Sequence, residues 1–230
     1  MSPTIESVLP NVTSSPEAKP KISWDGNKAP AIVVVEGIHD VEFLQRLTAR
    51  LHQEAPSIPD LQELEHNQAL VFIPFGGGHV LRWAERFAPL GCPEFHLFDR
   101  ECEPETALRY QAADLVNSRP GCRALVTSKR SLENYLHMVA IHAAGGGLIE
   151  VQDQDDVALC YARRSFLARP HDCAWDALPT KAQRRMAATA KKWLNTAAVD
   201  CMTLELLRHR DPQGELITWI RAIGHAAITR

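Results

Sequence analysis

The sequence predicts an α/β protein in which a four-stranded parallel sheet is flanked by helices and followed by a small C-terminal helical extension. Two observations carry this prediction. Short apolar runs alternate with helical periodicity between residues 31 and 126, and no convincing strand follows residue 150. Four strand–helix steps in succession imply parallel strands joined by right-handed crossovers. The composition, 45% hydrophobic and 23% charged with a net charge of −3, is that of an ordinary globular protein.

The predicted elements follow from local patterns. Residues 31–35 form a continuous apolar, β-branched run, as expected of a strand buried on both faces of a parallel sheet. Val41, Leu44, Leu47 and Leu51 then recur at three- and four-residue spacing, which predicts an amphipathic helix. Further strands are predicted at residues 69–75, 94–98 and 122–126, with helices at 80–88 and 105–117 between them.

Three segments organise the chain. Residues 1–30 contain five of the fifteen prolines and are predicted to be a disordered tail, because they cannot bury enough apolar surface to offset their ordering entropy. Residues 31–145 are predicted to form the α/β domain, and residues 146–230 the helical extension. Within the extension, helices are predicted at residues 156–166, 180–194, 203–210 and 215–223.

The composition also excludes several classes of protein. No apolar run approaches the length of about 20 residues that a membrane-spanning helix needs. The first thirty residues lack the apolar core of a signal peptide, so we expect a cytoplasmic protein with no membrane partner. The six cysteines include no Cys-x-x-Cys pair, which argues against a zinc finger and favours free thiols. With a net charge of −3, any nucleic acid must be bound through a local basic patch.

Acidic residues follow the predicted strands at the sheet edge where open parallel sheets carry their functional groups. Glu36 directly follows the first strand, and Asp40 lies at the start of the next helix. Asp99 and Glu101 follow the third strand, and Glu133 follows the fourth after a short loop. For Asp40, capping of the helix N-terminus is a serious alternative. We expect these carboxylates to converge at one edge of the sheet.

Converging carboxylates repel one another unless a cation holds them. Mg²⁺ suits such a site, because it prefers oxygen ligands and keeps several waters for a phosphate substrate. Two such ions about 4 Å apart could stabilise the attacking and leaving oxygens of a phosphodiester cleavage. The pattern therefore predicts a divalent-cation site that could support phosphodiester cleavage.

Four segments resemble one known family. Residues 32–40, Ile-Val-Val-Val-Glu-Gly-Ile-His-Asp, resemble the opening motif of a TOPRIM domain in the form found in OLD-family (overcoming lysogenization defect) nucleases. Residues 72–78 resemble that group's second strand and glycine turn. Residues 97–101 stand in the place of its Asp-x-Asp motif, with Glu101 as the second acid, and residues 129–136 resemble its Glu-Asn-Tyr-Leu motif.

The resemblance, which covers about residues 31–140, implies a TOPRIM fold and an Mg²⁺- or Mn²⁺-dependent endonuclease acting on DNA, with RNA as the alternative substrate. One or two ions would be held by Glu36, Asp40, Asp99, Glu101 and Glu133. The family's nucleases also use a basic residue near the scissile phosphate, for which Lys129 and Arg130 are the nearest candidates.

OLD-family nucleases usually carry an ATPase domain on the same polypeptide. No segment of this chain matches the P-loop pattern Gly-x-x-x-x-Gly-Lys-Ser/Thr. We therefore expect a stand-alone nuclease whose ATPase partner, if it needs one, is a separate ABC-type chain. By analogy with the family, its biological role would be defence against phages or plasmids.

The helix predicted from residue 180 carries five basic residues and no acidic one. At 100° per residue, Lys181, Arg185 and Lys192 fall on one face, and Arg184 and Lys191 adjoin it. Such a stripe could neutralise backbone phosphates without reading the base sequence. A merely solvated helix face explains the pattern equally well.

Two other functions remain as alternatives. The first is a catalytically weak TOPRIM module that senses or scaffolds nucleic acid or a partner ATPase, since Glu101 is one methylene longer than the family's Asp. The second is primase or topoisomerase chemistry, for which the chain is short and shows no separate domain for a nucleophilic tyrosine among Tyr110, Tyr135 and Tyr161. The pattern leaves the oligomeric state open.

Overall fold

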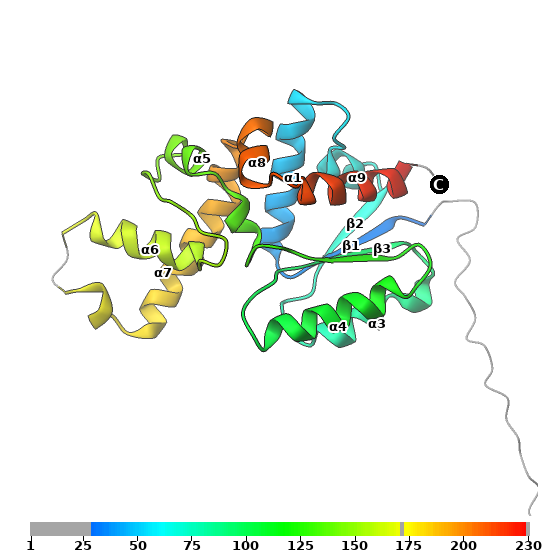
Figure 1. The fold of residues 1–230 in the computed structure, drawn as a ribbon, viewed down its shortest axis with the longest axis horizontal. Coiled ribbons are helices and arrows are strands. Elements are labelled where there is room, and N and C mark those ends of the chain that lie inside the picture. Colours follow the sequence, from blue (N-terminus) through cyan, green and yellow to red (C-terminus); the bar gives the residue numbers. More distant parts are fainter. Residues whose placement is uncertain (1–28, 171–172, 229–230) are drawn as a thin grey trace, which may run out of the picture.

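The computed structural model describes residues 29–170 and 173–228 (Figure 1). The tail predicted for residues 1–30 falls almost entirely outside them. Within the described residues, four strands form one parallel sheet in the order β2-β1-β3-β4. The strands are β1 (Ala31–Val35), β2 (Leu70–Pro74), β3 (Glu94–Phe98) and β4 (Arg123–Val126). The predicted α/β class and the all-parallel sheet are confirmed.

The central strand β1 shows why the sheet is covered on both faces. Ala31, Val33 and Val35 belong to one hydrophobic cluster, whereas Ile32 and Val34 belong to another. Since successive side chains of a strand point to opposite faces, these two clusters are the two layers beside the sheet. A continuously apolar strand is therefore the pattern that a three-layer structure requires.

Helices on either side complete these layers (Figure 1). On one face lie α1 (Ile38–Glu54), α2 (Leu61–His66) and α9 (Glu215–Ile228). On the other face lie α3 (Val80–Arg86) and α4 (Glu105–Asn117). The buried side chains of α1 include the four that the sequence pattern selected, Val41, Leu44, Leu47 and Leu51.

Two local features differ from the sequence prediction. Helix α2 was not predicted, although Asp60 caps it by accepting hydrogen bonds from the main-chain N–H groups of Gln62 and Glu63. The helix expected to reach residue 88 ends at Arg86 and is followed by the 3₁₀-helix η1 (Ala88–Leu90). Pro89 explains the early end, because it lacks the N–H group that an α-helix interior needs.

The chain after the sheet is largely helical. A 3₁₀-helix, η2 (Leu132–Tyr135), and α5 (Met138–Ala143) precede an antiparallel pair, α6 (Val157–Leu167) and α7 (Thr180–Trp193), which projects from the body in Figure 1. The remaining segments are η3 (Trp175–Ala177), the π-helix η4 (Leu194–Ala198) and α8 (Leu204–Arg210).

The helical segment beyond residue 145 is only partly an extension. Helices α6 and α7 share a small hydrophobic cluster of their own that includes Phe166 and Trp175. Helix α9 instead returns to the sheet, so that Ile220 lies in the same cluster as Leu44 and Val33. The boundary predicted at residue 145 therefore does not coincide with a break in the main hydrophobic core.

Two expectations about the chain's environment can be compared with the structure. Among the helices of the described ranges, none has both the length and the apolar character needed to cross a bilayer. All six cysteines are free thiols, as the spacing predicted.

Candidate metal centre

Three predicted acidic residues meet at the carboxyl edge of the sheet. Glu36 follows β1, Asp99 follows β3, and Glu101 lies two residues further along the same loop. Each offers a carboxylate oxygen, and these oxygens lie within 4.8 Å of one another. Parallel strands whose ends share one edge bring these residues together although 65 positions separate the outer two. The spacing suits oxygen ligation of one small divalent cation.

Asp40 lies beside this group at the start of α1. Its Oδ2 accepts a hydrogen bond of 2.6 Å from the main-chain N–H of Gly37, so the residue does cap the helix. Its Oδ1 is buried and has no hydrogen-bond partner. An unpartnered buried carboxylate oxygen is costly, and a bound cation would remove that cost. Capping therefore uses only one of the two oxygens of this side chain.

Glu133 is held in η2 and is 2% exposed. Its Oε1 accepts a 2.5 Å hydrogen bond from Nδ2 of Asn195. The Nζ of Lys191 lies 3.4 Å from the same oxygen and 3.8 Å from Oδ1 of Asp40. Lys191 thus connects the two acids that lie outside the three-carboxylate group.

The position of Lys191 corrects a prediction. The sequence pattern assigned it to an exposed phosphate-binding stripe, whereas it points into the acidic cluster. Lys191 stands in the last turn of α7, close to Asn195 and Glu133, and this place along the helix brings its Nζ to the acidic cluster. The other four members of the stripe are exposed on α7. They are Lys181, Arg184, Arg185 and Lys192, and among the described residues none of them forms an ion pair.

Arg109 is a functional candidate that the sequence prediction missed. It lies on α4, and its Nε and Nη2 donate hydrogen bonds of 2.7 and 3.0 Å to the two carboxylate oxygens of Glu36. Its side chain is only 6% exposed. The available signal was its helical spacing, because Arg109 stands one turn before the buried Ala112 and Ala113. An arginine on the apolar face of a helix needs a buried partner.

The two basic residues of the fourth-strand loop point to different places. Lys129 has its Nζ 2.5 Å from Oδ1 of Asp153 and lies over the ring of Tyr135, so its contacts are not with the acidic cluster. Arg130 instead has its Nε 3.7 Å from Oε2 of Glu101. The chain bends at these two residues, and only Arg130 reaches the cluster. Lys129, predicted to be catalytic, is therefore outside the site as the structure places it.

Burial controls the titration of the acids. It raises the pKa of Asp40 to about 6, although Lys191 opposes this. Burial also raises the pKa of Asp99 well above its ordinary value, and the negative charges of Asp40 and Glu36 add to the effect. For Glu36, burial raises the pKa against the opposing effect of Arg109. These acids favour a proton or a metal ion as counter-charge.

The pKa values of Glu133 and Lys191 are shifted in the directions that keep both groups charged. Burial disfavours the ionised form of Glu133, but Lys191 and Asn195 outweigh it and lower the pKa of the carboxyl group. Burial likewise disfavours the charged form of Lys191, yet Glu133 and Asp40 raise the pKa of its ammonium group. This pair is therefore a stable ion pair at neutral pH.

The formal charges of the acidic cluster do not balance. Five carboxylates, Glu36, Asp40, Asp99, Glu101 and Glu133, face three cations, Arg109, Arg130 and Lys191. The excess is two negative charges, which one divalent cation would neutralise. The donors are all oxygens, so the site fits Mg²⁺ or Mn²⁺ and does not resemble a thiolate or imidazole site for zinc.

Comparisons with known proteins add no relative from which a role could be transferred. No family model matches the chain, and no curated protein and no solved structure matches it either. The interpretation of the site therefore depends on its own chemistry and on the motifs in its sequence.

Proposed function

We propose that this chain is a TOPRIM-type nuclease of the OLD family that uses Mg²⁺ or Mn²⁺ to hydrolyse phosphodiester bonds of DNA. The observation that supports this best is the group formed by Glu36, Asp99 and Glu101, with oxygens within 4.8 Å of one another. The four-stranded parallel sheet is compatible with a TOPRIM fold. The separate positions of the motifs along the chain would then be explained by their meeting at one edge.

The acids divide into two sets in this proposal. Glu36, Asp99 and Glu101 would hold one ion, and Oδ1 of Asp40, which has no hydrogen bond and lies 3.8 Å from Lys191, could serve as a further ligand. A bound ion would supply Lewis-acid activation of water and stabilisation of charge on the phosphate. Glu133 is neutralised by Lys191 and would orient that ammonium group rather than ligate the first ion.

Arg109, Asp40 and Lys191 would set the charge and the protonation state of the site. Arg109 fixes both oxygens of Glu36 and opposes the effect of burial on the pKa of this carboxylate. Asp40, with a pKa of about 6, can exchange a proton near neutral pH, as a general base requires. Lys191 lies beside Asp40 and can neutralise charge on a phosphate bound next to it.

Metal-ion stabilisation of the protein should depend on pH. Folding raises the pKa of Asp40 from 3.8 to about 6, so its contribution to stability is full below pH 3.8 and is lost as the pH rises through about 6. A divalent cation binds the ionised form and restores the lost contribution. We therefore expect saturating Mg²⁺ to raise the melting temperature more at about pH 8 than at about pH 5.

Differential scanning fluorimetry at the two pH values, with Mg²⁺ and with EDTA, measures this difference. Glu103→Gln is the matched control, because Glu103 is an exposed acid of the same loop that lies outside the cluster. This variant should keep the full pH dependence. A larger Mg²⁺ effect at the acidic pH would contradict the assignment.

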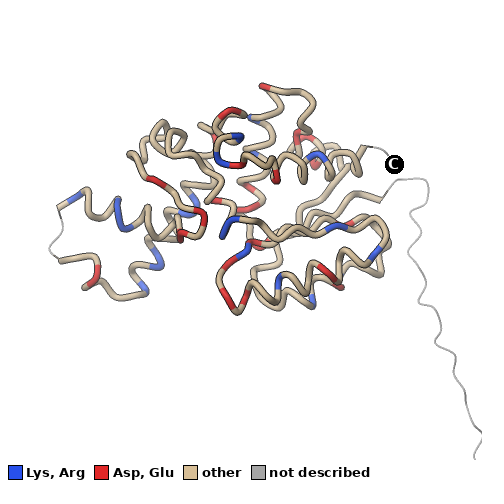
Figure 2. The backbone as a smooth tube through the Cα atoms, in the orientation of Figure 1, with Lys and Arg blue, Asp and Glu red and all other residues tan. Residues whose placement is uncertain are grey.

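DNA binding is assigned to the exposed face of α7. Figure 2 shows basic positions distributed over the α6–α7 pair. Lys181, Arg184 and Arg185 of α7 are exposed. Phosphate contacts of this kind position a strand and do not select its sequence. RNA would be bound by the same contacts, so the assay must include both nucleic acids.

Neutralising this face should weaken binding without changing the preferred sequence. For Lys181→Gln combined with Arg184→Gln and Arg185→Gln, the dependence of log Kd on log salt should fall by about 1 per residue removed. Fluorescence anisotropy with labelled DNA at several salt concentrations measures the slope. Arg82→Gln, on the exposed side of α3, is the control and should leave the slope unchanged. An unchanged slope in the triple variant would remove α7 from the interface.

One observation favours a second function. Arg109 pairs with Glu36, and Lys191 is shared between Asp40 and Glu133, so the protein itself already offsets part of the negative charge of the site. A catalytically weak module that senses nucleic acid or scaffolds a separate ABC-type ATPase would need no more than this. Because the chain has no P-loop pattern, ATP hydrolysis would come from such a partner in either case.

A cleavage assay distinguishes the two functions. Supercoiled plasmid, single-stranded DNA and RNA are incubated with Mg²⁺ or Mn²⁺ and wild-type protein, Glu36→Gln, Asp99→Asn or the control Glu103→Gln. The nuclease proposal expects cleavage by wild type and the control, and none by the two site variants. If wild type and the folded site variants leave the same intact substrates, with and without a candidate ATPase, the scaffold function is the better description.

A further inference from the structure

A cavity of about 240 Å³ adjoins the metal centre on the side of the α6–α7 pair. Glu101 and Glu133 form its wall toward the acidic cluster, Asp156 adds a third carboxylate, and Arg130 and Lys191 contribute two cations. On the opposite side the lining is made by small side chains such as Ala187 of α7. A group bound in this cavity would therefore lie beside two cations and next to the candidate metal ligands.

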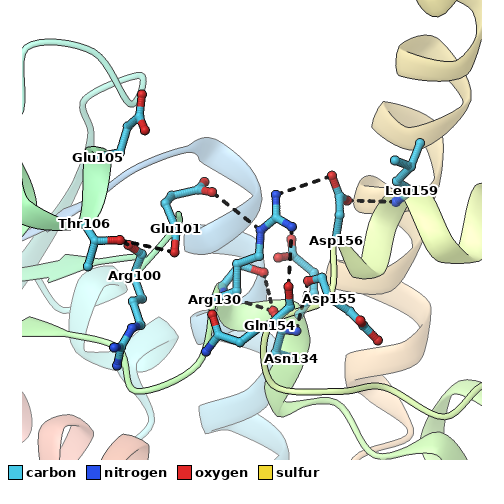
Figure 3. Close-up of polar contacts among 12 residues, drawn as sticks. Arg100, Glu101, Glu105, Thr106, Arg130, Asn134, Gln154, Asp155, Asp156 and Leu159 are labelled. Carbon is cyan, nitrogen blue, oxygen red and sulfur yellow. Dashed lines mark hydrogen bonds and ion pairs between the residues drawn. The ribbon is translucent and has the colours of Figure 1, made fainter. Parts of the chain in front are cut away.

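Arg130 is loosely held in this cavity (Figure 3). Its Nε lies 3.7 Å from Glu101, its Nη2 lies 3.8 Å from Asp156, and its Nη1 donates a long hydrogen bond of 3.5 Å to the main-chain oxygen of Gln154. A guanidinium group carries five N–H donors in a planar fork. Since only one donates here, and only at 3.5 Å, the fork has capacity for a stronger acceptor.

Glu101 depends on Arg130 in two ways. Its main-chain N–H donates a 3.0 Å hydrogen bond to the main-chain oxygen of Arg130, and its carboxylate faces the Arg130 guanidinium. Its φ of +55° is a left-handed conformation that a residue other than glycine rarely adopts. Such conformations persist where the surroundings enforce them, and they are frequent at functional sites. Glu101 therefore stands between two cationic partners, Arg130 on one side and the candidate metal ion on the other.

We propose that this cavity is a subsite for a phosphate group of the bound strand, where Arg130 exchanges Glu101 for the phosphate and so releases Glu101 to the metal ion. The inference rests on the proposed nuclease function. Arginine binds phosphate through two parallel charge-assisted hydrogen bonds, which its long contacts with Glu101 do not provide. The exchange breaks no covalent bond.

The exchange couples substrate binding to metal binding. If a strand makes Glu101 available to the metal, the metal must in turn strengthen strand binding by the same factor. The metal centre would then be fully assembled only when a strand occupies the cavity. The small side chains of α7 and α6 at this point, Ala187, Ala188 and Ala158, leave the space that such a phosphate needs.

The test measures Mn²⁺ affinity by electron paramagnetic resonance, with and without a short phosphorothioate DNA that resists cleavage. In the wild-type chain the DNA should tighten Mn²⁺ binding about tenfold. Arg130→Gln should bind Mn²⁺ several-fold more tightly than wild type without DNA, and should gain less than twofold when DNA is added. Arg130→Lys, which keeps the charge but loses the fork, should show an intermediate gain.

Two further variants complete the design. Arg100→Gln is the matched control, because Arg100 lies on the same loop as Glu101 but points away from Arg130 in Figure 3. It should keep the wild-type gain. Glu101→Gln tests the exchange without changing Arg130: its Mn²⁺ affinity without DNA should fall because one candidate ligand loses its charge, and the gain with DNA should be absent. This variant decides the matter if Arg130→Gln does not fold.

Each other outcome has a defined meaning. An equal gain in wild type and in folded Arg130→Gln, or a gain that persists in Glu101→Gln, would overturn the exchange. The same gain with inorganic phosphate at equal phosphate concentration would overturn the assignment to a strand. If wild type binds Mn²⁺ and cleaves DNA but shows no coupling, only this inference fails, whereas absence of Mn²⁺ binding in all variants rejects the proposed function itself.

Discussion

Asp99→Asn should abolish cleavage and at the same time make the metal-free protein more stable. Asp99 is 4% exposed, and burial, together with the charges of Asp40 and Glu36, raises its pKa well above the ordinary value. An amide of nearly the same size removes the buried charge and the repulsion. We expect the melting temperature in EDTA to rise by about 2–4 °C, which corresponds to about 1 kcal/mol in a chain of this size.

The same substitution removes an anionic ligand from the three-carboxylate group. Cleavage should fall by about 100- to 1000-fold or more, as is typical when a positioned charge is lost from a catalytic site. The increase in melting temperature on adding Mg²⁺ should fall with it, because the ion loses one of its oxygens.

Two measurements on one preparation check this pair of effects: thermal unfolding with and without Mg²⁺, and nicking of supercoiled plasmid. Glu103→Gln, in the same loop but exposed, should change neither. Cleavage at the wild-type rate by folded Asp99→Asn would exclude the residue as a metal ligand. A lower melting temperature in EDTA would show that its charge is better compensated than its burial indicates.

Opposite effects on stability and activity are what separate a functional acid from a structural one. Glu94, in the strand β3 that precedes Asp99, provides the comparison. It is 1% exposed, but it pairs with His96 at 2.9 Å and with Arg119 at 2.6 Å, so its charge has partners within the protein. Asp99 has neighbours of its own sign as the strongest charges acting on it. The protein therefore keeps at Asp99 a repulsion that a purely structural site would not retain.

The elements of the sheet could be predicted because their signals are local. The limits of β3 and α4 coincide with the predicted ranges 94–98 and 105–117, and the predicted apolar face of α1 is buried. The meeting of Glu36 with Asp99 followed from a rule of topology, since parallel strands end at one edge. Neither conclusion required knowledge of side-chain packing.

The cations of the site could not be predicted in this way. Whether Lys191 faces solvent or the acids depends on how α7 packs against the body, which is a contact between distant segments. The same is true of Arg109, whose partner Glu36 is 73 positions away. Helix α9 shows the same limit at the level of the fold, because its apolar pattern predicted a helix but not its return to the sheet. Local patterns determine elements, whereas the direction of a charged side chain is decided by tertiary packing.

Lys191→Met should destabilise the metal-free protein, and both a lower pH and added Mg²⁺ should reduce this loss of stability. Lys191 is the cation nearest to Asp40 and Glu133, each about 3% exposed at the side chain. Removing one partner of a buried ion pair costs about 3–5 kcal/mol, and because the Lys191 side chain is itself 36% exposed we expect about 2–3 kcal/mol near neutral pH. Below the Asp40 pKa of about 6 the loss of stability should shrink, since protonation of Asp40 removes one of the two buried negative charges that the substitution leaves without a cation.

Urea unfolding at about pH 5 and about pH 8, in EDTA and in Mg²⁺, tests this expectation. Mg²⁺ should restore part of the stability of Lys191→Met at the higher pH, because the ion replaces the missing positive charge within the cluster. Lys192→Met is the matched control: it removes the neighbouring, exposed lysine and should change the free energy of unfolding by less than about 0.5 kcal/mol. A loss in Lys191→Met that is equal at both pH values and unaffected by Mg²⁺ would mean that the side chain stabilises the protein by packing, and that its charge does not serve the acidic cluster.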